Sequence, residues 1–343
     1  MKRIIWSSLV LVLVLALIGP ALMGGTVEAQ NGEVCYAVAD NDKSDAQSTD
    51  QLVTLNKASG VLDVIGATGT FHVEAIAFDT DGVTLYAAEH NEDEGEGQLG
   101  TLDLANGAFT ATSSTFGTGS GVDGDVTFSD IDSLAIYPAT GELYGAHRRE
   151  GGLDDVLIKI DKSTGAHVPD AFGTGVDYVV ISGTDVLDDI DDIAIDPSDG
   201  TMYATANEGG DYGDLITINM SSGAATLVGP FNADDMEGLA FFTDGNLYGS
   251  SGEYDNITDE TKNKLYSINK QTGAATELWP FTLHSDYEAL GCLTEPSSVG
   301  LLGVQAADGS RNMLNAGLLM GLAALVGLTA VVVWRRETPP VEA

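Results

Sequence analysis

Short runs of alternating apolar and polar residues, separated by glycine-containing turns, recur along most of the 343-residue chain. One phrase returns several times: an acidic residue, then small, apolar, small and apolar residues, a glycine turn, and an apolar residue followed by tyrosine. It occurs at residues 74–86, 132–144, 191–203 and 237–248. Alternation of this kind, broken by glycine turns, is typical of antiparallel hairpins. Each copy therefore predicts two paired strands.

A second phrase recurs between the copies of the first and predicts another hairpin. It consists of a short alternating strand, a tight turn ending in glycine, and a second strand. Its five copies are "LVTLNKASGVLDVIG" (52–66), "LGTLDLANGAFTATS" (99–113), "LIKIDKSTGAHV" (157–168), "LITINMSSGAATLVG" (215–229) and "LYSINKQTGAATELW" (265–279). Each repeat thus holds four short strands, which is the strand content of a β-propeller blade.

The number of blades follows from the first phrase. Its copies begin at five acidic residues, Glu74, Asp132, Asp191, Glu237 and Glu288. The expected fold is therefore an all-β, five-bladed propeller. The connections at 114–130 and 169–189 are long enough to contain an additional hairpin, so a six-bladed ring is the alternative.

The repeats resemble the large group of extracellular propellers with "LA(F/I)xPxTGxLY" and "LxxIDxxTGAxTxVG" phrases, which includes YVTN, NHL and gluconolactonase-like propellers. The resemblance covers roughly residues 33–293 and implies a fold rather than one function, because propellers host many functions. "MEGLAF" at 236–241 is also similar to the segment with the metal-binding glutamate of senescence-marker and gluconolactonase propellers, which implies a metal ligand at Glu237. The other ligands of that family have no evident counterpart, and this departure puts lactonase activity in doubt.

The two ends of the chain predict export and anchoring. Two basic residues, an apolar run and small residues fill positions 1–29 in the order of a secretory signal peptide; an uncleaved anchor is the alternative. A linker at 295–312 leads to an apolar stretch at 313–334 with the length of a transmembrane helix. Two arginines open the tail at 335–343, which predicts that the tail is cytoplasmic. The propeller, residues 30–294, is therefore expected outside a cell membrane that the protein crosses once.

The predicted propeller starts and stops out of phase with its repeat. Residues 33–39, "EVCYAVA", match the second strand of a blade, and 287–292, "YEALGC", match the first strand. The N-terminal segment would then supply three strands of one blade, and the C-terminal segment its missing inner strand. Pairing between the two ends would close the ring.

The chain has two cysteines, and the repeat alignment brings them together. Cys292 takes the position of Ile136, and Cys35 takes that of Leu143. In the repeat these two positions oppose each other across a predicted hairpin, where side chains are close enough for a disulfide. An exported protein usually pairs its cysteines. We expect a Cys35–Cys292 disulfide, with two buried free thiols as the alternative.

The chain is strongly acidic, with 14 Lys and Arg against 52 Asp and Glu and a formal net charge of -38. A surface of this charge repels nucleic acid and anionic lipid headgroups and attracts cations and basic partners. Adaptation to high salt would leave the same composition.

The turns differ between the two expected faces of the ring. One face has short, uniform glycine turns, and the other has long, variable, acidic loops, where binding usually occurs. We expect binding-face residues to include Asp42, Asp93, Arg148, Asp211 and Tyr254. The segment His147–Arg149 is a compact basic cluster with acids nearby to pair with.

The five aligned acids should form a ring at the mouth of the central channel, on the face with the long loops. Asp130, Asp189, Asp235 and Asp286 precede members of the ring by two residues and would enlarge it. Converging carboxylates repel one another unless a proton, water or a cation intervenes. Oxygen ligands in this number suit Ca²⁺ rather than zinc. Acids that only cap the strand ends and face water are the alternative.

Three functional hypotheses follow. The first is a membrane-anchored extracellular binding module for a protein, glycan or small ligand, with Ca²⁺ as its only cofactor. The second is a metal-dependent hydrolase or lyase that uses the carboxylate ring. The third is an acidic structural protein of the cell surface.

Overall fold

The structure, a computed structural model, describes residues 34–40, 49–90, 97–149, 151–183, 187–207, 213–233, 235–252, 263–282 and 286–293. The chain divides into two compact units, residues 1–294 and 295–343, and every described residue belongs to the first. The predicted signal peptide, linker, transmembrane helix and tail lie outside the described residues. Within the described part, no helix has the length and hydropathy needed to cross a membrane.

The described strands form five four-stranded antiparallel sheets and one separate hairpin. Blade A contains β22 (Asp286–Cys292), β1 (Val34–Asp40), β2 (Gln51–Asn56) and β3 (Val61–Ala67). Blade B contains β4 (Val73–Phe78), β5 (Leu85–Glu89), β6 (Gln98–Leu102) and β7 (Phe109–Thr115). Blade C contains β10 (Ile131–Ile136), β11 (Leu143–His147), β12 (Val156–Ile160) and β13 (Tyr178–Val180). Blade D contains β14 (Ile193–Ile195), β15 (Met202–Ala206), β16 (Asp214–Ile218) and β17 (Ala225–Pro230), and blade E contains β18 (Met236–Phe241), β19 (Leu247–Ser251), β20 (Lys264–Ile268) and β21 (Ala275–Pro280).

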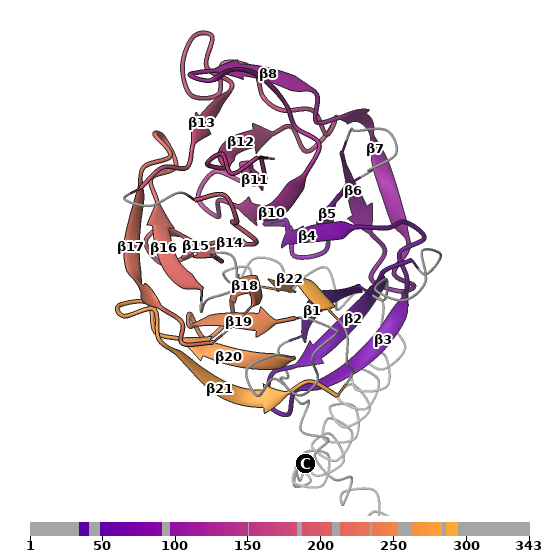
Figure 1. The fold of residues 1–343 in the computed structure, drawn as a ribbon. Helices are drawn as coiled ribbons and strands as arrows, with labels where there is room; N and C mark the ends of the chain where they lie inside the picture. Colours follow the sequence, from indigo (N-terminus) through magenta and orange to yellow (C-terminus); the bar gives the residue numbers. More distant parts are fainter. Residues whose placement is uncertain are drawn as a thin grey trace, which may run out of the picture. The chain divides into compact units, whose positions relative to one another are not determined.

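The five sheets stand around a central axis as the blades of a propeller (Figure 1). The first strand of each sheet, β4, β10, β14, β18 or β22, lies next to this axis and beside its counterparts in the neighbouring blades. All six residues of inner strand β10 are buried, whereas none of outer strand β21 is. The apolar alternation of the repeats therefore builds a core between adjacent blades, and five buried clusters fill the five junctions.

The predicted closure of the ring is confirmed. Strand β22 pairs antiparallel with β1, so one blade is built from both ends of the propeller. Cys35 and Cys292 face each other in this pairing and form a disulfide across 257 residues of sequence. The closed ring exposes no unpaired terminal blade.

The six-bladed alternative is wrong. The long connection at 114–130 does contain a hairpin, β8 (Thr118–Gly121) and β9 (Gly124–Thr127), but these strands pair only with each other. The hairpin lies against β13 of blade C rather than beside the axis (Figure 1). Gly121 has no room for a side chain because the ring of Tyr178 occupies that space. This close packing fixes the hairpin as an extension of blade C.

Candidate functional site

A β-bulge places each of four predicted ring acids at the start of an inner strand. Glu74, Asp132 and Glu237 are each the unpaired residue of the bulge between their strand and the second strand of the blade. Glu288 occupies the same place where β22 meets β1. A bulge bends the strand and redirects the extra side chain. The acidic residue of the repeat is therefore a bulge residue whose side chain lines the channel mouth.

The bulged acids line a cavity of about 220 Å³ at this mouth. Its nine lining residues are Glu74, Asp132, Arg148, Asp189, Asp191, Asn207, Asp235, Glu237 and Glu288. Seven of them are carboxylates and one is an arginine. All five predicted ring residues are present, together with two of the flanking acids. We call this space the acid cavity, and the face of the propeller that carries it the acid face.

Arg148 is the counter-ion of one side of the acid cavity. Its Nε lies 2.7 Å from Asp132 Oδ2, and its Nη2 lies 2.5 Å from Asp189 Oδ1 and 2.6 Å from Asp191 Oδ1. The predicted binding-face arginine thus belongs to the cavity wall, where its guanidinium joins acids of blades C and D. Asn207 contributes on the same side by donating from Nδ2 to Asp191 Oδ2 at 2.5 Å.

Burial controls protonation in the acid cavity. It raises the pKa of Asp132 and of Asp191 well above the usual range for a carboxyl group. Burial and then the charge of Asp130 raise the pKa of Glu74 to about 7. For Arg148, burial favours the neutral form, but the surrounding carboxylates prevail and raise its pKa. At neutral pH the cavity therefore holds both negative charge and exchangeable protons.

Two histidines flank the cavity beside blade B. His90 Nδ1 lies 2.9 Å from Asp130 Oδ1, and this hydrogen bond is the main cause of the raised pKa of His90. His72 Nδ1 lies 3.8 Å from Glu74 Oε1. The interior of the cavity is lined mainly by carboxylates.

Asp192 differs in type from the residues at the same position of the other repeats, and its carboxylate hydrogen-bonds to inner strands of two other blades. Other copies place a small residue at its position, such as Gly238 in β18. The buried carboxylate of Asp192 accepts hydrogen bonds from the backbone N–H groups of Ile193 at 2.8 Å and Leu239 at 2.6 Å, and also from that of Leu290. These bonds tie the inner strands of blades D, E and A together beside the acid cavity.

Sequence reasoning missed Asp192 and Asn207. The residue after the second strand, aligned across the repeats, is His90, Arg148 or Asn207 in blades B, C and D. Aligning this position would have identified Asn207 as a residue of the rim. Nothing in the alignment indicates that Asp192 reaches two other blades, because that distance depends on how the ring closes.

The predicted loop residues Asp42, Asp93, Asp211 and Tyr254 lie outside the described residues. The predicted calcium site remains a prediction. Among the residues that the structure describes, no three His, Cys, Asp or Glu side chains are grouped as metal ligands. Three of the seven cavity carboxylates bind Arg148 instead.

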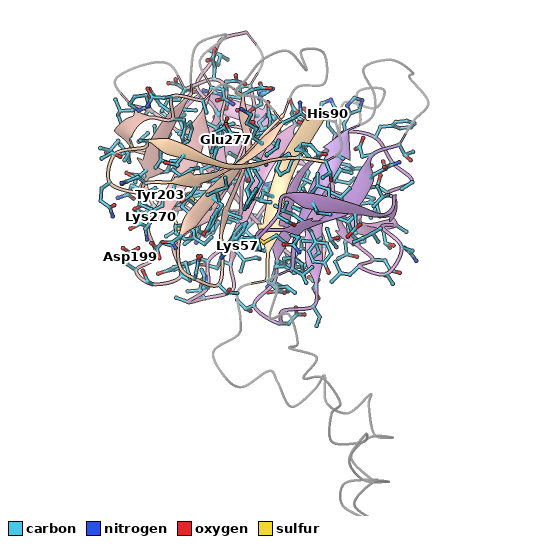
Figure 2. All side chains as sticks on the ribbon, turned by 90° about the horizontal axis from the view of Figure 1, so that it is seen from below. Lys57, His90, Asp199, Tyr203, Lys270 and Glu277 are labelled. Carbon is cyan, nitrogen blue, oxygen red and sulfur yellow. A yellow bond between two sulfur atoms is a disulfide. The ribbon has the colours of Figure 1, made fainter. Side chains whose placement is uncertain are left out.

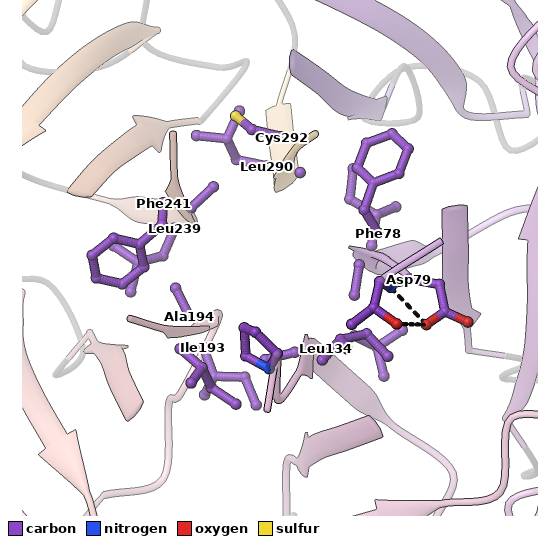
Figure 3. A pocket seen from close by; sticks show the side chains of 18 residues that line it. Phe78, Asp79, Leu134, Ile193, Ala194, Leu239, Phe241, Leu290 and Cys292 are labelled. Carbon is purple, nitrogen blue, oxygen red and sulfur yellow. Dashed lines mark hydrogen bonds between the residues drawn. The ribbon is translucent and has the colours of Figure 1, made fainter. Parts of the chain in front are cut away.

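The opposite mouth of the channel has different chemistry. A cavity of about 100 Å³ there is lined mainly by apolar side chains from the ends of the inner strands, including Phe78, Leu134 and Leu290 (Figure 3). Its carboxylate, Asp79, is bound to Lys162 at 2.8 Å. The ionisable groups that could bind or react are therefore concentrated at the acid face.

Comparisons with known proteins found solved structures of low similarity to this chain. A proposed 6-phosphogluconolactonase from Bacteroides uniformis is 11% identical, covering 77% of this chain and 100% of the other, with a TM-score of 0.42. TolB from Acinetobacter baumannii is 10% identical over 77% of this chain and 67% of its own, with a TM-score of 0.44. A nidogen–laminin complex gives 11% identity, 76% and 98% coverage and a TM-score of 0.44. No protein-family model and no curated protein matches the sequence.

Proposed function

We propose that this chain is a binding propeller that takes a cation in the acid cavity. One observation carries the proposal: seven carboxylates and a single arginine line one cavity of about 220 Å³. Arg148 can balance only one of these charges, so a cation that enters the cavity lowers the remaining repulsion. Ca²⁺ is the first candidate because it prefers several carboxylate oxygens and accepts irregular coordination.

The proposed ion would bind on the side of the cavity away from Arg148. Glu74, Glu237 and Glu288 line the cavity from inner strands of blades B, E and A, whereas Arg148 follows β11 of blade C. Cation binding there would displace the proton that burial retains on Glu74. Binding should therefore release protons and strengthen as the pH rises from about 6 to 8.

The proposal includes tethering at a cell surface, as the sequence of the chain ends predicts. The inner strands start at the acid face, and β1 runs antiparallel to β22. The last described strand, β22, therefore ends at the face opposite the acid cavity, where β1 begins.

Thermal unfolding of the full chain in detergent, with Ca²⁺, Mg²⁺, chelator or NaCl, tests the proposal. A ligand that binds only the folded state raises the midpoint as its concentration exceeds Kd. We expect Ca²⁺ to raise the midpoint and Glu237→Gln to abolish the rise. Glu277→Gln is the matched control, because Glu277 is an exposed residue on the outer strand of the same blade.

The outcomes test the calcium proposal against the acidic structural protein. A midpoint that ignores Ca²⁺ and chelator would contradict the calcium proposal. A midpoint that rises with NaCl as much as with Ca²⁺ would favour an acidic surface protein adapted to salt. Loss of the calcium effect in both variants would place the ion outside the acid cavity.

A further inference from the structure

A second cavity on the acid face, of about 520 Å³, lies between the β8–β9 hairpin and blade C. Its lining includes His90, Asp123, Asp125, Thr127, Asp130, His147 and Arg149. We call it the hairpin pocket. Its volume is within the range of small-molecule sites. Arg148 lines both this pocket and the acid cavity, so the two spaces adjoin.

The hairpin pocket is built by a contact that the other described blades lack. Arg149, whose side chain is 8% exposed, places Nη1 2.8 Å from Asp123 Oδ2 at the tip of the hairpin. Its Nε donates to the backbone carbonyl of Asp154. The buried Arg149 side chain thus links Asp123 of the hairpin to the backbone beside blade C, and this link fixes the hairpin at the edge of the pocket.

The acids of the hairpin pocket each have a partner beside the pocket. Asp123 pairs with Arg149, Asp130 pairs with His90, and Asp125 accepts a hydrogen bond from Ser120 Oγ. The pocket therefore has no net preference for a cation. A purely apolar ligand is also disfavoured. It would displace water from the charged side chains of the pocket and would find few apolar side chains to contact.

His147 presents an unused hydrogen-bond acceptor in this pocket. The residue is only 4% exposed, and its Nδ1 lies 2.6 Å from the backbone carbonyl oxygen of Asp130 and 3.3 Å from the Asp130 N–H. A carbonyl oxygen can only accept, so the shorter contact assigns the proton to Nδ1. That bond fixes the neutral tautomer with the lone pair on Nε2. Burial, the leading influence, lowers the pKa of His147. Among the described residues, none hydrogen-bonds to Nε2.

We propose that the hairpin pocket binds a neutral polyhydroxylated molecule, with one hydroxyl group donating to His147 Nε2. Hydroxyl groups both donate and accept, so they suit a wall that carries carboxylates and guanidinium groups together. A metal is a poor fit, because Asp123 already pairs with Arg149 and Asp130 with His90. The proposal concerns a different site from the cation site and does not depend on it.

The test is calorimetric titration of the full chain with glucose, mannose and myo-inositol at millimolar concentrations. Thr127→Trp should weaken binding by at least about tenfold, because the new ring fills the pocket from an exposed position on β9. Thr110→Trp is the matched control, since Thr110 is an exposed threonine on β7 outside the pocket. The control should bind as the original chain does.

A second measurement needs no substitution. The ¹⁵N resonance of His147 Nε2 should shift on addition of the bound polyol, whereas that of Nδ1 should stay nearly constant. The proposal is overturned if none of the three probes binds, if Thr127→Trp binds as well as Thr110→Trp, or if Nε2 does not respond. Binding of glucosamine but not glucose, lost in Glu237→Gln, would assign the ligand to the acid cavity and also overturn it.

Discussion

At the scale of single residues, Arg148 determines the electrostatics of the acid cavity. Its guanidinium binds Asp132, Asp189 and Asp191, so one charge serves three carboxyl groups from two blades. The network gains little stability overall, because desolvation of the buried Asp132 and Asp191 offsets much of the attraction and the Arg148 side chain is 37% exposed. Its removal is expensive, because the carboxyl groups would then lie together without a counter-ion. We infer that this network is retained for the shape and charge of the cavity.

Buried carboxyl groups predict that stability falls as the pH rises. Burial raises the pKa of Glu74 and of Asp155 to about 7, whereas such groups ionise near pH 4 in an unfolded chain. Between about pH 4.5 and 7 the folded state therefore binds more protons than the unfolded state, and stability decreases with rising pH. Asp244, whose pKa is lowered to about 2 despite burial because Lys57 and other groups hydrogen-bond to it, acts in the opposite direction only below about pH 4.

Urea unfolding at pH 5, 6, 7 and 8 with chelator present measures this dependence. The midpoint should be highest near pH 5 and decline to pH 8. Glu74→Gln should flatten the decline, and Glu277→Gln should not. A midpoint that increases steadily from pH 5 to 8 would show that these groups ionise normally in the folded protein.

At the scale of elements, two kinds of contact recur between neighbouring blades. The first is the glycine turn between the third and fourth strands, which packs against the outer strand of the preceding blade at all five junctions. The pairs are Gly60 with Trp279, Gly107 with Gly66, Gly165 with Thr112, Gly223 with Val180, and Gly273 with Gly229. These glycines have positive φ and also leave no room for a Cβ atom. The turn that recurs in every blade therefore also packs against the neighbouring blade.

The second kind of contact is an ion pair between a lysine of one blade and an aspartate of the preceding blade, on the face opposite the acid cavity. Lys270 of blade E reaches Asp196 of blade D at 2.5 Å and lies over Phe241, while Lys57 of blade A pairs with Asp244 of blade E (Figure 2). At the junction of blades C and D, Met220 replaces the lysine and packs in the same cluster as Tyr137. At this junction both partners are therefore hydrophobic.

A pair of glycine substitutions separates packing from backbone strain. Gly223 and Gly245 both have positive φ, at 72° and 75°, but an added Cβ would overlap the carbonyl oxygen of Val180 only at Gly223. Gly245→Ala should cost about 1 kcal/mol, the usual strain of alanine in this conformation. Gly223→Ala should cost about 1–3 kcal/mol more, because blades C and D must separate locally.

Chemical denaturation of the two variants measures the difference. Equal losses of unfolding free energy would mean that the junction moves apart without cost, and that the turn does not join the blades.

At the scale of the whole molecule, local repetition predicted the ring, but the contacts across it could not be read from the repeats. The acid of each repeat was identified because it recurs, and the Cys35–Cys292 disulfide because both residues align with opposed positions. The bonds of Asp192 to other blades depend on the radius of the channel, which no single repeat encodes. The β8–β9 hairpin was considered as part of a possible sixth blade. It instead packs against Tyr178 of blade C, because Gly121 has no side chain to keep it away, and it lines the hairpin pocket.

Closure of the ring predicts that the Cys35–Cys292 disulfide contributes strongly to stability. The bond spans 257 residues and joins the two ends of the propeller in one blade. In the chain-entropy account, a loop of this length constrains the unfolded state by up to about 5 kcal/mol. The double variant Cys35→Ala and Cys292→Ala should therefore unfold at a clearly lower urea concentration, with β22 separating from β1 first.

Hydrogen exchange of the double variant should show faster exchange of β1 and β22 amides than of β10 amides. The unreduced original chain, denatured in guanidinium, should react with no thiol reagent, and unchanged stability in the double variant would mean that strand pairing alone closes the ring.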